Sequence, residues 1–166
     1  EDRLNDLKDT RLSDQYGSLN DKLKVFLEIL SQKMDPSEIS YQRYKSIFKK
    51  VYLQAINNIK QSVMSKQIIN SIDEDILKKE ITKLKKEGNE ELLNVKEDRL
   101  YLFENELKNL NAILVENDRA IQEMEEVTIE MSRLKGTKGE DHRLINQAIK
   151  ELDDWTQKVE VYNKRV

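Results

Sequence analysis

Apolar residues recur at alternating steps of three and four positions along one long stretch of the chain. Twelve positions follow this heptad spacing, and nine of them are apolar: Leu93, Leu100, Phe103, Leu107, Leu110, Leu114, Ile121, Met124 and Met131. Such a row lies along one side of an α-helix that packs lengthwise on another helix. At 1.5 Å per residue, a helix over residues 90–134 extends roughly 65–70 Å, which is too long for the interior of a compact domain.

Composition supports a helical fold and excludes several kinds of chemistry. Four glycines and one proline in 166 residues supply too few turns for a β-sandwich or barrel. No cysteine and one histidine exclude disulfides, thiol nucleophiles and the paired Glu-x-x-His motifs of a di-iron bundle. We therefore predict an all-α, elongated helical bundle of about five helices that includes an antiparallel coiled-coil hairpin, with no catalytic, cofactor or metal site.

Helix signals divide the chain into three regions. Residues 1–17 form a polar segment, either a frayed helix or a segment of low order, and residues 18–88 form a helical region whose first helix begins at Ser18. Caps at Asp35-Pro36-Ser37-Glu38 and Ser71-Ile72-Asp73-Glu74, and a stop at Gly88, separate its helices. In residues 89–166, the long helix and a final helix with Trp155 on its apolar row form the coiled-coil hairpin.

Charge is distributed unevenly along the chain. Residues 36–86 carry 11 basic and 5 acidic groups, whereas residues 87–134 carry 5 basic and 13 acidic groups. Opposite charges on neighbouring helices favour pairing and fix their orientation. We therefore expect the acidic long helix to lie against the basic helices, rather than the basic surface to remain free for an external polyanion.

Two basic clusters are candidate binding surfaces. The first interleaves cations with rings: Arg43, Lys45, Lys49 and Lys50 with Tyr41, Tyr44, Phe48 and Tyr52. Because the rings share one helical stripe, we expect them in the core, and nucleic acid is not expected as a partner. The second is a set of lysines with the spacing of an amphipathic helix that can lie on anionic lipid: Lys78, Lys79, Lys83, Lys85 and Lys86.

Other residues suggest chemistry only weakly. Glu123, Glu126 and Glu130 share a helix face, but no second set of ligands is evident and a charged coiled-coil flank explains them. His142 is expected at the surface. The segment Gly136-Thr137-Lys138-Gly139 lacks the spacing of a phosphate-binding P-loop and is expected to be a hairpin turn.

The sequence favours a non-enzymatic interaction or scaffolding module, expected to be part of a larger protein because the chain begins at Glu1 rather than methionine. Its richness in lysine, isoleucine and asparagine favours a bacterial source, and its lack of cysteine favours the cytoplasm. The expected contact with a protein partner or second copy is an exposed part of the heptad row: Leu100, Phe103, Leu107, Leu110, Leu114, Asn117, Ile121, Met124 and Met131. Asn117 either sets the register or marks where the row opens to solvent. The alternative is a peripheral membrane or stress-response module that binds anionic lipid. No small-molecule substrate is inferred.

Overall fold

The computed structural model describes residues 10–134 and 140–163, with side chains described for 10–134 and 143–157. These residues form α-helices joined by short turns, and no strand occurs among them. The helices are α2 (Thr10–Lys33), α3 (Ile39–Asn70), α4 (Glu74–Glu87), α5 (Glu90–Arg133) and α6 (Glu140–Asn163). The structure confirms the predicted all-α bundle and the predicted long helix, which runs unbroken from Glu90 to Arg133.

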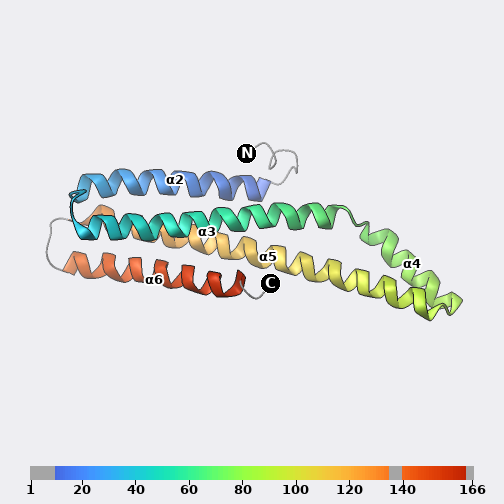
Figure 1. Ribbon diagram of the computed structural model, residues 1–166. Coiled ribbons are helices and arrows are strands. Elements are labelled where there is room, and N and C mark those ends of the chain that lie inside the picture. The colour runs from blue at the N-terminus through green and yellow to red at the C-terminus, as the bar shows by residue number, and fades with distance from the viewer. Residues whose placement is uncertain (1–9, 135–139, 164–166) are drawn as a thin grey trace.

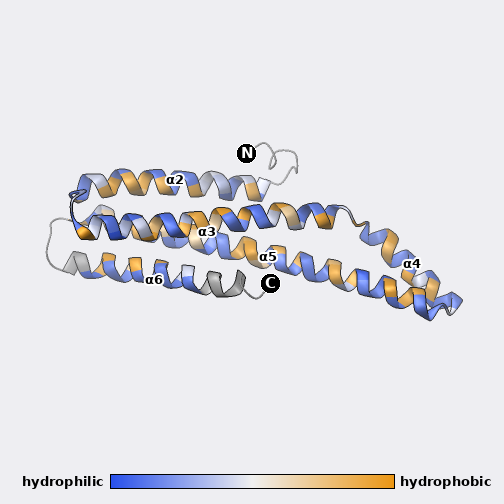
Figure 2. Cartoon of the chain, in the orientation of Figure 1, coloured by the Kyte–Doolittle hydropathy of each residue, from blue (hydrophilic) through white to orange (hydrophobic). Residues whose placement is uncertain are grey.

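The helices α3 and α5 form the central pair, and α2 and α6 pack against that pair from opposite sides (Figure 1). The helices α2 and α3 run antiparallel, as do α5 and α6, so the predicted hairpin of the last two helices is confirmed. We call this four-helix part the body. Figure 2 shows that apolar and polar residues alternate around each helix, as expected where one stripe of each helix is buried.

The core of the body combines apolar side chains from all four of its helices. Phe26 of α2 stacks on Phe48 of α3, with ring centroids 3.8 Å apart. The helix α5 contributes Leu110, Leu114, Met124 and Met131 to this core, and α6 contributes Ile145, Ile149, Leu152 and Trp155. Burying each large side chain contributes about 1.5–3 kcal/mol, so this core is the main source of the stability of the fold.

A two-helix arm extends from the body. It consists of α4 and the first part of α5, residues 74–109, and lies beyond the ends of α2 and α6 (Figure 1). Its own small core contains Leu77, Ile81 and Leu84 of α4 with Phe103 of α5, all less than 9% exposed. These four side chains are not part of the core cluster of the body.

The turn between the arm helices follows the predicted signals. Gly88 ends α4 with φ +73°, the left-handed conformation that favours glycine, and its N–H donates to the carbonyl of Leu84. Asn89 then caps α5 by accepting from the Leu92 N–H, and Asp73 caps α4 by accepting from the Ile76 N–H at 2.9 Å. These caps fix where the arm helices begin and end.

Two predicted helix starts are wrong. The helix predicted to begin at the Asp35-Pro36 cap begins at Ile39, with Glu38 at the N-cap position and no side-chain cap hydrogen bond. The first described helix begins at Thr10 rather than Ser18. Leu12 and Leu19 are fully buried and Gln15 is 3% exposed, so the inward row of this helix starts at Leu12, about two turns before Leu19. Residues 1–9 lie outside the described part of the chain, which leaves the prediction for that segment open.

Candidate functional site

The heptad row of α5 is buried mostly within the chain itself. Six of the nine predicted contact residues have exposed fractions of 7% or less: Phe103, Leu110, Leu114, Asn117, Met124 and Met131. Leu100 and Ile121 are half-buried, and Leu107 is 39% exposed. The expectation of an exposed seam is therefore wrong for those six residues, because α4 in the arm and α2, α3 and α6 in the body already cover the row.

Asn117 lies at the centre of a buried polar layer. It is fully buried, its Oδ1 accepts from the Asn58 side chain at 3.0 Å, and its Nδ2 donates to the Ala55 carbonyl at 3.2 Å. The side chain of Gln15 lies 3.5 Å away and donates to the Leu114 carbonyl at 2.8 Å. Of the two readings, the structure supports register over an opening to solvent, because the layer ties α2, α3 and α5 together at one level.

This layer was not found as a unit in the sequence. Its members are 99 to 103 positions apart between α2 and α5 and about sixty apart between α3 and α5. Gln15 and Asn58 interrupt otherwise apolar rows, and that interruption is the only signal that could have found them. A buried amide needs a partner, so polar residues in inward positions of different helices are expected at the same level.

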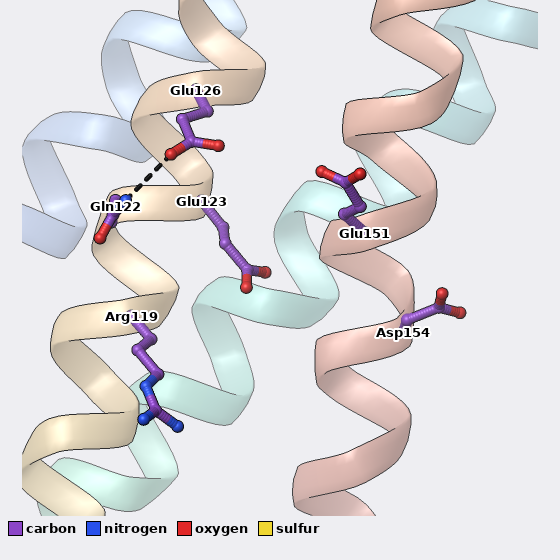
Figure 3. A pocket seen from close by; sticks show the side chains of 6 residues that line it. All are labelled: Arg119, Gln122, Glu123, Glu126, Glu151 and Asp154. Atoms are coloured by element: carbon purple, nitrogen blue, oxygen red, sulfur yellow. Dashed lines mark hydrogen bonds between the residues drawn. The ribbon is translucent and has the colours of Figure 1, made fainter.

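A shallow hollow of about 350 Å³ lies between α5 and α6 (Figure 3). It is lined by Arg119, Gln122, Glu123 and Glu126 of α5 and by Glu151 and Asp154 of α6. In Figure 3 Glu151 points toward α5, whereas Asp154 points away, and Gln122 donates to Glu126 at 3.0 Å. Glu130, the third glutamate of the predicted face, is paired with Arg133 at 2.6 Å. Among the described residues no three potential ligands converge on a metal position.

The basic helix α3, which has six cations and no carboxylate, lies against the acidic helix α5, as the charge distribution predicted. The helix α4 has five lysines and four carboxylates, so it is nearly neutral, and it is joined to α5 by ion pairs in both directions. Lys96 pairs with Glu80 at 2.6 Å, and Lys85 pairs with Glu97 at 2.9 Å. Between α2 and α5, Lys22 pairs with Glu125 and Arg11 pairs with Asp118. Exposed pairs are each worth about 0–1 kcal/mol, so they orient the helices more than they stabilise them.

Three of the five lysines predicted as lipid contacts have acidic partners. Lys78 pairs with Glu74 at 2.5 Å, Lys83 with Glu87 at 3.7 Å, and Lys85 with Glu97. The hydrogen bond to Glu74 is the main cause of the raised pKa of Lys78. Lys79 and Lys86 are exposed and have no ion pair among the described residues. The cationic face of α4 is therefore partly neutralised by its own neighbours.

The aromatic stripe of α3 lies in the core, as predicted. Tyr41, Tyr44 and Phe48 are buried, and Tyr52 is half-buried. The hydroxyl of Tyr44 donates to Asn146 of α6 at 2.9 Å, and that of Tyr52 donates to Asn20 of α2 at 2.8 Å. Burial raises the pKa of both hydroxyls. These rings are unavailable for stacking on bases.

Exposed apolar side chains gather on and beside the arm. Of fourteen large apolar side chains that are exposed in the described residues, eight lie between positions 64 and 107: Met64, Ile68, Ile76, Leu92, Val95, Tyr101, Leu102 and Leu107. The sequence interpretation missed most of them. Leu92, Val95 and Leu102 nevertheless repeat the heptad spacing one position before the buried heptad row of α5, which we call the core row. This surface, rather than the core row, is the candidate site.

The side chain of His142 and the segment 135–139, which contains the predicted glycine turn, lie outside the described residues. Trp155 is in the core, as expected, and its indole N–H has no hydrogen-bond acceptor among the described residues.

Among the described helices, none combines the length and the apolar composition that a membrane-spanning segment requires. Comparisons of the chain with protein-family models, curated proteins and solved structures find no match.

Proposed function

We propose that this chain is a non-enzymatic interaction module in which the four-helix body holds the two-helix arm out toward a protein partner. The observation that carries the proposal is the concentration of exposed apolar side chains on and beside the arm. Side chains such as Leu102, 66% exposed, lose contact with water when a partner covers them, and each buried methylene contributes about 0.8 kcal/mol. Exposed apolar side chains that share one helix face, as Leu92, Val95 and Leu102 do by their spacing, are typical of interaction sites.

The body supports this role by holding the arm in place. The helix α5 is continuous from the arm into the core of the body, so the arm cannot reorient without bending a helix. The polar layer around Asn117 fixes the register of α5 against α2 and α3 where the body begins. A rigid element that carries a contact surface loses little conformational entropy when it binds.

A protein partner fits this surface better than a lipid surface. Its apolar residues share the arm with both acidic and basic groups, and Lys78, Lys83 and Lys85 are paired with glutamates. Helices that lie on anionic membranes instead present an excess of unpaired cations. Lipid binding is accordingly the competing outcome in the test.

Site-specific photo-crosslinking tests the proposal. A benzophenone amino acid is placed at Val95 on the arm, and in a matched variant at Val25, which is exposed on α2 of the body. In cells that produce the protein, we expect protein adducts at position 95 and few at position 25. Equal labelling at both positions, or none at position 95, would contradict the proposal.

A membrane assay separates the two partner classes. The purified protein is sedimented with vesicles of phosphatidylcholine alone or mixed with phosphatidylglycerol. We expect no sedimentation with either vesicle. Binding that increases with phosphatidylglycerol and falls with added salt would replace the protein-partner proposal by the lipid alternative.

A further inference from the structure

One flank of α5 in the arm repeats the spacing of a coiled-coil seam. Leu92, Val95 and Leu102 are 43%, 58% and 66% exposed. With Arg99, Glu106 and Asn109 they form a row at steps of 3, 4, 3, 4 and 3 positions, which we call the outer row. This is the spacing at which one helix packs lengthwise on another. The core row of the same helix is already occupied, so the outer row is a second seam.

The ion pairs of the arm show which side the outer row occupies. Lys85 and Glu97 pair along one edge of the hairpin, and Lys96 and Glu80 pair along the other. Arg99 of the outer row is three residues after Lys96, and residues three apart are neighbours on a helix surface. The outer row therefore borders the edge of the hairpin where Lys96 pairs with Glu80. Ile76 precedes Glu80 by one turn and is 54% exposed. In an antiparallel hairpin it therefore lies on this same edge, at about the level of Leu102.

We infer that the outer row binds the outer row of a second copy of this chain, antiparallel and two-fold symmetric, with Leu102 facing its own counterpart. This inference rests on the proposed function and names the partner. In this register Arg99 of each copy lies opposite Glu106 of the other, because Arg99 is three residues before Leu102 and Glu106 is four residues after it, which are about 4.5 and 6 Å along the helix from the two-fold axis. Each contact occurs twice, as a two-fold interface requires.

Charge selects this arrangement over the alternatives. A parallel pair in register would place Arg99 against Arg99 and Glu106 against Glu106, and like charges at such positions destabilise pairing. Within the described residues neither Arg99 nor Glu106 takes part in an ion pair; Arg99 is exposed and Glu106 is half-buried. Both charges are therefore available to a neighbouring molecule. Leu102 and Ile76 from the two copies meet at the centre of the interface and supply its apolar contact.

Sedimentation equilibrium of the purified protein, over a range of concentrations, tests the inference. We expect the wild type to form dimers. Each single reversal, Arg99→Glu or Glu106→Arg, weakens the dimer at least about tenfold, since it places like charges together. The double variant Arg99→Glu/Glu106→Arg restores the pair with reversed signs and returns the affinity to near that of the wild type. Circular dichroism checks that each variant remains helical.

A matched control and two outcomes make the result decisive. Lys79→Glu changes an exposed charge on α4 away from the outer row and should leave the dimer unchanged. A dimer that ignores the single reversals, or is not restored by the double one, overturns this register. A wild type that stays monomeric at every concentration overturns self-association, while protein adducts at Val95 in the crosslinking test would still support another partner.

Discussion

The buried polar layer predicts a specific energetic coupling between Asn58 and Asn117. Asn58→Ala removes the donor to Asn117 Oδ1 and leaves that oxygen unpaired where both residues are no more than 2% exposed. A buried polar group without a partner costs about 1–3 kcal/mol, and the lost hydrogen bond adds about 1 kcal/mol. We expect each single alanine variant to lower the free energy of unfolding by about 2–3 kcal/mol.

The double variant should cost less than the sum of the two single ones. Once both amides are removed, neither leaves the other unpaired, so the free energy of unfolding should fall by about 3–4 kcal/mol in total, with a coupling of about 1–2 kcal/mol. Urea unfolding followed by far-ultraviolet circular dichroism measures all four proteins of the cycle. The dependence on urea concentration should keep the same slope.

A matched pair shows whether the coupling is specific. Thr128 is also buried, but its hydroxyl donates to Met124 of its own helix at 2.7 Å, three turns from the polar layer. Thr128→Ala combined with Asn58→Ala should therefore be additive to within about 0.5 kcal/mol. If the losses in free energy of unfolding for Asn58→Ala and Asn117→Ala also add to within about 0.5 kcal/mol, the two amides do not act as one unit and the reasoning is refuted.

Three further predictions follow from burial and backbone geometry. Leu114→Asp should lower the free energy of unfolding by more than about 4 kcal/mol, because it buries a charge. In the same urea assay the exposed Leu107→Asp should lower it by less than about 1.5 kcal/mol. Equal losses would contradict the assigned burial of the two leucines. Gly88→Ala should destabilise the arm by about 1–2 kcal/mol through its positive φ, seen as faster amide exchange in α4, with Gly88→Asn milder; unchanged exchange would exclude the left-handed turn. Burial raises the pKa of Tyr44, so its contribution to the free energy of unfolding is complete below the unfolded pKa of about 10 and is lost as the pH rises from there through the folded pKa. When unfolding is measured at increasing alkaline pH, the Tyr44→Phe variant should lose stability less steeply than the wild type. Identical profiles would count against the burial of that hydroxyl.

The long helix and the arm turn were predictable because their signals are local. Nine apolar residues on one heptad frame require a single helix, and Gly88 with Asn89 supplies a stop and a cap at adjacent positions. The packing of α3 on α5 was predictable from opposite net charge, because α3 has six cations and no carboxylate while α5 is acidic. These inferences need only residues that are close in sequence or a sum over a segment.

The occupant of the core row was not predictable, because periodicity shows that a row is covered but not by what. The sequence interpretation left Leu110, Leu114 and Met124 for a partner, whereas α2, α3 and α6 of the same chain cover them. The early start of α2 was missed for a related reason. Gln15 looks like a surface residue until the structure places Asn117 and the Leu114 carbonyl beside it. Contacts between residues about 100 positions apart leave no local pattern.

The claim on which the rest depends is that α5 is one straight helix whose first part stands outside the body. The chain has no cysteine, so two cysteines that replace Glu91 and Ser132 are the only thiols that a spin label can modify. Pulsed electron resonance, with labelled protein diluted into an excess of unlabelled protein, then measures the distance within one chain. The helical rise predicts one narrow distribution near 62 Å, from about 1.5 Å for each of the intervening steps. A broad distribution, or one centred well below this value, would mean that the helix breaks and that the arm does not exist.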